Sequence, residues 1–136
     1  MVKLIMGLQG AGKTKQLVEN INEAVKTETG SMVCIEEGNK LRYDIDSRVR
    51  LIEYREYMMR DLPSLKGFVS GLCAGNFDIT HIFIESFYKL IDNGTPAEIE
   101  DFVLWCDRFG TARNIDFTIL VSEDPTVVSD TLKKYM

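Results

Sequence analysis

The chain has only three cysteines among its 136 residues, and they lie far apart at Cys34, Cys73 and Cys106. An odd number of isolated cysteines fits neither a disulfide framework nor a metal-binding spacing, so they predict buried thiols in a reducing compartment. No apolar run approaches the roughly 18 residues of a membrane-spanning helix, and the short apolar stretch at the start favours a strand over a signal peptide. The sequence also has no internal repeat and no low-complexity segment. These absences predict a cytoplasmic protein that has no membrane partner.

The length and charge of the chain limit its organisation and its partners. With 136 residues, 45% of them hydrophobic, the sequence predicts one globular domain over residues 1–136. The net charge of −5 argues against nucleic acid as a partner, because a phosphate backbone would be repelled outside a local basic patch. Arginines recur between residues 40 and 60, where they alternate with acidic residues. This stretch indicates either a mixed-charge face or a site for a second anionic substrate.

Residues 7–14 read Gly-Leu-Gln-Gly-Ala-Gly-Lys-Thr and match the P-loop pattern G-x-x-x-x-G-K-[ST] at every specified position. The match follows an apolar run over residues 1–6 and precedes an amphipathic stretch, which is the strand–loop–helix setting that the motif requires. Backbone amides of residues 9–15, at the start of the expected helix, would then surround a chain of phosphates. The motif predicts a nucleoside triphosphate with Mg²⁺ as the ligand.

Each polar position of this motif has an expected role. Lys13 would contact the β- and γ-phosphates, and the Thr14 hydroxyl would ligate Mg²⁺. Ser122, at the end of a later apolar run, either contacts phosphate or water or caps the turn that follows. The expected nucleotide-binding residues are Gly7, Gln9, Gly10, Ala11, Gly12, Lys13, Thr14, Lys15 and Ser122.

Apolar runs alternate with amphipathic stretches along the chain. They predict a mainly parallel sheet covered by helices on both faces, a three-layer α/β/α sandwich. Strands are expected over residues 2–6, 32–35, 79–85 and 117–121, a returning strand over 41–45 and a short strand over 49–54. Helices are expected over residues 13–26, 63–75, 95–109 and 130–135. Ligands of such sheets bind at the carboxyl ends of the strands, where Gly7, Glu36, Glu85 and Ser122 all lie.

Glu85 ends the apolar run Ile82-Phe83-Ile84 and has the form of a Walker B carboxylate. There it would hold a Mg²⁺-bound water or activate the attacking water, unless it is only a solvated strand end. The sequence departs from the common pattern in two ways, because Glu replaces the usual Asp and Ser86 stands where many hydrolysing proteins carry a catalytic Glu. Either Glu85 serves both roles, or the base is Glu36 or Glu37, which equally fit turn chemistry.

Three other polar residues have weaker expected roles. His81 lies in the middle of an expected strand, so we interpret it as a packing residue and not as a catalytic base. Arg108 and Arg113 flank the turn before the last strand. One of them could act as an arginine finger, including across a subunit interface in a homo-oligomer, or both could belong to a solvated loop.

The motif over residues 7–14, the strand ending at Glu85 and the alternation of strands and helices resemble the P-loop NTPase superfamily over essentially the whole chain. The strands after Glu85 and the polar tip at Ser122 are similar to the RecA-like, or ASCE, division. The stretches 7–17 and 71–84 also resemble a family of short stand-alone bacterial ATPases labelled as PilT-like twitching-motility proteins. The His- and Asp-rich boxes and the extra domain of pilus-retraction motors do not occur here. The resemblance implies ATP and Mg²⁺ as ligands and does not imply pilus motility.

Three functions fit these observations. The chain is a minimal Mg²⁺-dependent ATPase, a nucleotide-binding regulatory module with little hydrolysis that acts on a protein partner, or a small nucleoside or metabolite kinase. In the kinase, residues 38–60 would supply the lid or the acceptor pocket. The order of the strands in the sheet distinguishes these functions. A strand between the strand that leads to Gly7 and the strand that ends at Glu85 favours the RecA-like ATPase. Direct pairing of those two strands favours the kinase–GTPase division. With about four core parallel strands, the RecA-like order could leave the Gly7 strand at an edge of the sheet.

Overall fold

A computed structural model describes residues 1–8, 10–38, 40–85 and 95–136, and over these residues the sheet is parallel throughout. The five strands are arranged in the order β1-β5-β4-β2-β3. Each neighbouring pair is parallel, so the predicted α/β class with a parallel sheet is confirmed. The strands are β1 (Val2–Gly7), β2 (Ser31–Glu36), β3 (Val49–Glu53), β4 (Ile79–Ile84) and β5 (Asp116–Ser122).

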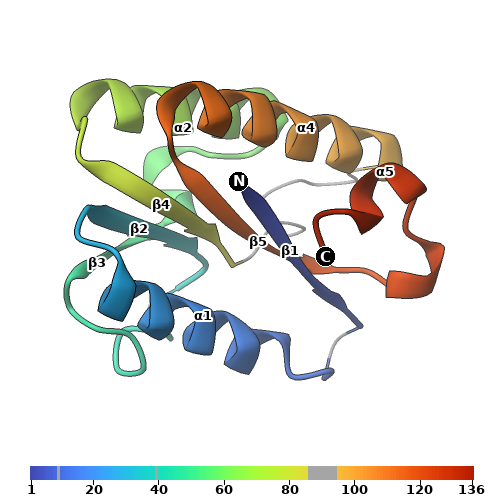
Figure 1. Cartoon of the computed structure of the whole chain (residues 1–136), viewed down its shortest axis with the longest axis horizontal. Coiled ribbons are helices and arrows are strands. Elements are labelled where there is room, and N and C mark those ends of the chain that lie inside the picture. The colour runs from blue at the N-terminus through green and yellow to red at the C-terminus, as the bar shows by residue number, and fades with distance from the viewer. Residues whose placement is uncertain (9, 39, 86–94) are drawn as a thin grey trace.

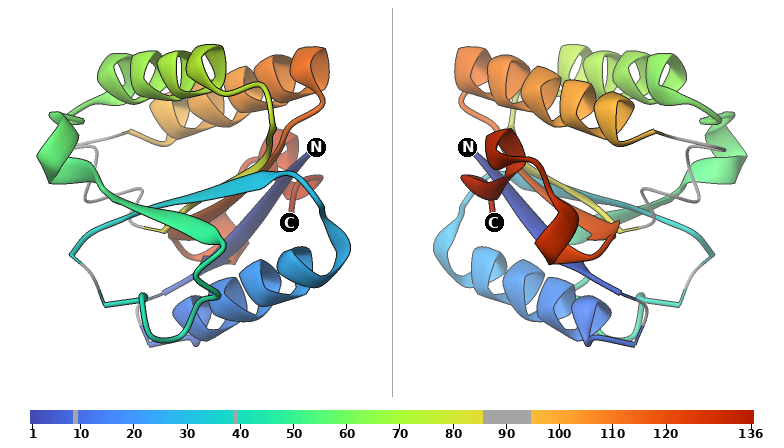
Figure 2. Two further views of the ribbon diagram at one scale, coloured as in Figure 1. Left: turned by 90° about the vertical axis from the view of Figure 1, so that its left-hand side faces the viewer. Right: turned by 90° about the vertical axis from the view of Figure 1, so that its right-hand side faces the viewer.

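Helices cover both faces of the sheet. Helix α1 (Lys13–Thr27) lies on one face, and helices α2 (Leu62–Gly75) and α4 (Pro96–Arg113) lie on the other, as Figures 1 and 2 show from three directions. The short helix α5 (Asp130–Lys133) lies beside β1, and two 3₁₀ turns cover Tyr54–Tyr57 and Pro125–Val127. The arrangement is compatible with the expected three-layer sandwich. No helix in the described ranges is long and apolar enough to cross a membrane.

The core has two halves, one on each face of the sheet. Val33 of β2 and Ile82 of β4 pack in the half that includes residues of α2 and α4. Their chain neighbours Cys34 and Phe83 pack in the half that includes residues of α1. Because successive side chains of a strand point to opposite faces, a residue two positions further along returns to the same face. The alternation therefore directs the residues at positions 36 and 85 to the face covered by α1.

The helix boundaries follow capping chemistry that is visible in the sequence. The Thr95 side chain accepts a hydrogen bond from the Glu98 amide (3.2 Å), and Pro96 occupies the first turn, so the predicted start of α4 is confirmed. Helix α2 begins with a capping box, in which the Ser64 amide donates to Asp61 Oδ1 (2.8 Å) and the Asp61 amide donates to the Ser64 hydroxyl (3.0 Å).

The returning strand expected over residues 41–45 is wrong, because this stretch is a series of turns. The Asp44 amide donates to the Leu41 carbonyl (3.0 Å) and closes a turn there. Leu41 and Ile45 are both buried against the α1 half of the core, whereas Tyr43 between them is 84% exposed. Two apolar residues four positions apart lie on one side of a helical turn as readily as on one side of a strand, so alternation over so short a stretch does not distinguish the two.

Strand β1 lies at an edge of the sheet. An open edge exposes unpaired backbone groups. Here the C-terminal segment covers part of it, because the Leu4 amide donates to the Tyr135 carbonyl (2.7 Å) and the Tyr135 hydroxyl donates to Asp107 Oδ2 (2.7 Å). The segment after β5 therefore holds in place the strand that carries the glycine-rich loop.

A substitution of Gly110 tests the packing of α4 on β5. A Cβ atom at this position would lie 2.4 Å from the Ile115 carbonyl oxygen, which is backbone and cannot move aside easily. We expect Gly110→Ala to destabilise the protein by about 1–3 kcal/mol in chemical denaturation. The matched control is Gly71→Ala on the exposed side of α2, where a Cβ meets no atom within 4 Å and alanine is the better helix former. Equal stability of the two variants would contradict the packing.

Candidate nucleotide-binding site

The glycine-rich loop connects the carboxyl end of β1 to the amino end of α1. Gly10 and Gly12 have φ angles of 87° and 80°, which a residue with a side chain rarely adopts. Around both glycines, the space that a Cβ would occupy has no other atom within 4 Å. At Gly7, in contrast, a Cβ would lie 3.1 Å from the Cβ of Ala11. The loop is therefore closely packed at its base and open at its rim.

The first turn of α1 lacks the groups that usually satisfy a helix N-terminus. Its N-cap is Gly12, no side chain caps it, and no acidic residue lies in the first turn. Within the described part of the chain, the amides of Gly12, Lys13, Thr14 and Lys15 donate no hydrogen bond, whereas the Ala11 amide donates to the Leu8 carbonyl (3.1 Å). Several adjacent N–H groups at the positive end of a helix thus remain available to an anion.

Lys13 extends back over this loop. Its side chain is largely buried, its stem lies 3.4 Å from a Cβ built at Gly7, and its ammonium group donates to the Leu8 carbonyl (3.0 Å). Lys15 lies in the same turn and is exposed. Two lysines at the positive end of a helix dipole repel that dipole, and the repulsion is relieved when an anion binds between them. The site is therefore electrostatically suited to a polyphosphate.

Ser122 lies next to the start of this loop. It is the register partner of Gly7 in the pairing of β5 with β1, and it is exposed at the end of its strand. The structure thus brings together the expected residues Gly7, Gly10, Ala11, Gly12, Lys13, Thr14, Lys15 and Ser122. Gln9 and Ser86 lie outside the described residues.

Three glutamates form a row across the neighbouring strands at the same edge of the sheet. Glu36 of β2 is the register partner of Glu53 of β3. Glu85 directly follows β4, and its amide donates to the carbonyl of Ile35, the residue before Glu36 (2.9 Å). All three are buried. Strand alternation directs them to the α1 face, so this row, which we call the glutamate row, continues the edge that begins at the glycine-rich loop.

The two outer members of the glutamate row are paired with cations. Glu85 Oε1 lies 3.2 Å from the Lys40 ammonium group. Glu53 Oε1 lies 2.5 Å from Arg55 Nε and 3.1 Å from the Gly38 amide. Burial alone would raise the pKa of Glu53, but these hydrogen bonds outweigh it and lower the pKa below its ordinary value.

Glu36, the middle member of the row, has no such partner. It has no exposed surface, and neither carboxylate oxygen accepts a hydrogen bond of normal geometry from a described residue. Burial raises the pKa of Glu36 to about 7, and the negative charge of Glu85 adds to this. The nearby Leu41 amide and Lys40 act in the opposite direction but do not cancel the effect. A carboxyl group with a pKa near 7 exchanges its proton at physiological pH, as a general base must.

Other expected residues lie away from this edge. His81 accepts or donates hydrogen bonds with Glu28 (2.8 Å) and Thr118 (2.8 Å) and stacks on Phe83, so its interpretation as a packing residue is consistent with its surroundings. Arg113 lies in the last turn of α4 with its guanidinium over the Phe109 ring, and Arg108 lies one turn earlier in the helix. Neither arginine belongs to a loop. The expected buried thiols are confirmed, because all three cysteines are free and buried.

Glu53 and Lys40 also belong to this edge, although neither was expected there from the sequence. Glu53 ends a strand just as Glu36 and Glu85 do, and that pattern could have identified it. Lys40 follows β2 within a turn and gives no periodic signal. Its contact with Glu85 depends on how residues 40–48 fold over the α1 face (Figure 2).

A separate pocket of about 400 Å³ lies on the other face of β1 and β5, between the start of α4 and α5. Its described lining is mostly apolar, with Met6, Val121 and Leu132, and its charged members Glu100 and Glu123 are both acidic. A triphosphate would be repelled there, so the glycine-rich loop remains the candidate phosphate site.

No protein-family model matches the chain, and no curated protein matches it.

Proposed function

We propose that this chain is a P-loop nucleotide-binding protein that binds ATP with Mg²⁺ and hydrolyses it. The observation that carries the proposal is the start of α1, which no side chain caps. There, amides with no acceptor among the described residues and two lysines follow a glycine-rich loop at the carboxyl end of β1. Fixed donors of this kind are unfavourable without an anion and match a chain of phosphates. The amides of Gly10 and of residues 12–15 would bind the phosphates, and Lys13 would leave the Leu8 carbonyl to contact the β- and γ-oxygens.

The glutamate row supplies the groups that hydrolysis requires. The Thr14 hydroxyl would ligate Mg²⁺, and Glu85 would hold a water of that ion in place of its ion pair with Lys40. Glu36 is the candidate base, because its pKa is near 7. Since Glu36 has no exposed surface, the segment that carries Lys40 and Leu41 must move before water can reach the carboxylate. We infer that release of Lys40 from Glu85 accompanies this movement.

The strand order favours the RecA-like reading over the kinase reading. Strand β5 lies between β1, which carries Gly7, and β4, which precedes Glu85. A polar residue on that intervening strand, Ser122, lies beside Gly7. A nucleotide-binding module with little hydrolysis remains the second candidate function. The burial of Glu36 favours it, because water does not reach the carboxylate in this conformation.

Phosphate release distinguishes these functions. Purified protein is incubated with MgATP, with and without a panel of nucleosides, and both inorganic phosphate and phosphorylated nucleosides are measured. The ATPase releases phosphate without an acceptor, and its rate is unaffected by the panel. A phosphorylated nucleoside would show a kinase, and nucleotide binding with neither product would show the binding module.

Glu85→Gln tests the metal-water role. The variant keeps the shape of the side chain but loses the charge that would hold the Mg²⁺-bound water. We expect nucleotide binding to remain within a few-fold and hydrolysis to fall by about 10²-fold or more. The matched control is Glu19→Gln on the exposed side of α1. Unchanged hydrolysis in Glu85→Gln would contradict this role for Glu85.

A further inference from the structure

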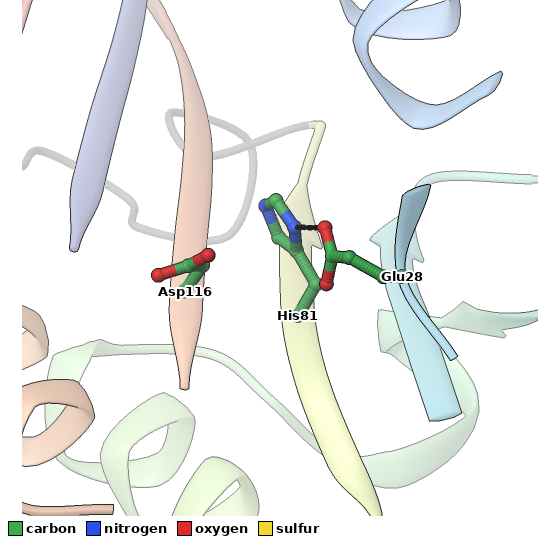
Figure 3. A group of neighbouring side chains, drawn as sticks. All are labelled: Glu28, His81 and Asp116. Carbon is green, nitrogen blue, oxygen red and sulfur yellow. Dashed lines mark hydrogen bonds and ion pairs between the residues drawn. The ribbon is translucent and has the colours of Figure 1, made fainter. Parts of the chain in front are cut away.

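A second group of ligand-type side chains lies at the amino ends of the strands, away from the glycine-rich loop. Glu28 follows α1, His81 comes from β4 and Asp116 begins β5. Figure 3 shows the imidazole between the two carboxylates, and one ligand atom from each residue lies within 4.8 Å of the other two. All three side chains are partly buried, so the group has both a fixed position and access to solvent.

The histidine of this group is held as a metal-bound histidine usually is. His81 Nδ1 lies 2.8 Å from Glu28 Oε2, and Nε2 lies 2.8 Å from the hydroxyl of buried Thr118. Metal-ligating histidines commonly hydrogen-bond through the second ring nitrogen, which fixes the ring for the metal. The Thr80 hydroxyl also donates to the other oxygen of Glu28 (3.0 Å) and orients that carboxylate.

We propose that Glu28, His81 and Asp116 form a site for a divalent transition-metal ion such as Zn²⁺. The ion would take the place of the proton between His81 Nδ1 and Glu28. Bonds of about 2.0–2.1 Å in a tetrahedral arrangement separate ligand atoms by about 3.4 Å, so the Glu28–His81 pair would open slightly and Asp116 would move inward. A mixed nitrogen and oxygen set favours Zn²⁺ over Mg²⁺, which prefers oxygen ligands in an octahedron.

The amino group of Met1 competes for Asp116, and the cysteines compete for the metal ion, but neither prevents metal binding at this site. The amino group of Met1 lies 3.1 Å from Asp116 Oδ1, but a carboxylate has further lone pairs and this one is 42% exposed. The alternative zinc ligands are Cys34, Cys73 and Cys106, and all are buried. Burial raises the pKa of each thiol, which disfavours the thiolate form that binds metal.

The single histidine of the chain makes a direct test possible. Untagged protein is titrated with Zn²⁺ in the absence of nucleotide, and the imidazole signals of His81 are followed by NMR together with the melting temperature. We expect the signals to move to saturation at one equivalent of Zn²⁺, the melting temperature to rise, and Mg²⁺ at the same concentration to do neither. Unmoved imidazole signals would overturn the proposal.

Variants then identify the ligands. We expect Glu28→Gln and Asp116→Asn each to weaken Zn²⁺ binding at least tenfold, and Thr118→Val to weaken it by about 10–100-fold through the loss of ring orientation. Glu28 and Asp116 are partly exposed, so these variants test the site even if a change at His81 prevents folding. The controls Asp130→Asn and Lys13→Ala should bind Zn²⁺ as the unaltered protein does. Unchanged affinity in both carboxylate variants would contradict the assignment, and neither result depends on nucleotide binding.

Discussion

Lys13→Ala should abolish the thermal stabilisation that MgATP gives to this protein. A ligand present at 100 times its dissociation constant stabilises the folded state by about 2.7 kcal/mol, which for a chain of this size raises the melting temperature by about 10 °C. The ammonium group of Lys13 lies over the loop, 3.0 Å from the Leu8 carbonyl, where it can turn to the β- and γ-phosphates. Its loss leaves the polyphosphate without the nearest positive charge.

The control for this result lies at the other end of the same helix. Lys26 is exposed in the last turn of α1, and its ammonium group is 3.8 Å from Glu23. Lys26→Ala should melt with MgATP as the unaltered protein does, because the change leaves the loop intact. An equal rise of the melting temperature in Lys13→Ala and Lys26→Ala would contradict the phosphate site.

Glu36→Gln should stabilise the protein in alkaline solution and lower its rate of ATP hydrolysis. The pKa of Glu36 is raised from 4.5 to about 7 in the folded protein. Below about pH 4.5 the carboxyl group is protonated in both folded and unfolded chains, so its ionisation does not affect stability. Between about pH 4.5 and 7 the unfolded chain loses the proton first, so stability falls as the pH rises. Above pH 7 the loss is complete and amounts to about 3 kcal/mol at most.

Glutamine removes this penalty because it carries no charge at any pH. Chemical denaturation at pH 8 should therefore show Glu36→Gln to be more stable than the unaltered protein, with the difference shrinking toward pH 4.5. Hydrolysis should fall by about 10²–10⁴-fold if Glu36 is the base. Glu56→Gln is an exposed carboxylate control. A stability difference that does not change with pH would show that Glu36 is charged throughout this range.

The sequence predicts the main elements of this fold because their signals are local. The P-loop pattern, the apolar run before Glu85 and the Thr95-Pro96 cap each lie within a few residues, and the structure has a strand or helix at each. Turn formation over residues 41–45 could not be read from alternation, since Leu41 and Ile45 face the core in either conformation.

The contacts within the glutamate row could not be predicted from local sequence patterns. The sequence places Glu36 and Glu85 at strand ends, but their proximity depends on β2 lying next to β4, which is a property of the sheet. The same holds for Glu53 and for Lys40, whose role appears only when residues 40–48 pack on the α1 face. Burial of Glu36, and with it the raised pKa, follows from this packing and has no sequence signal.

Binding of the ATP phosphates by the backbone amides at the start of α1 can be tested residue by residue. The most direct test is to assign the backbone amide signals by NMR and to add MgATP and then MgCl₂ alone. We predict that the amide signals of Gly10, Gly12, Lys13, Thr14 and Lys15 show the largest shifts with MgATP and none with MgCl₂. Saturating MgATP that leaves these five amide signals unmoved, or shifts signals from a different part of the protein instead, would contradict phosphate binding by this loop.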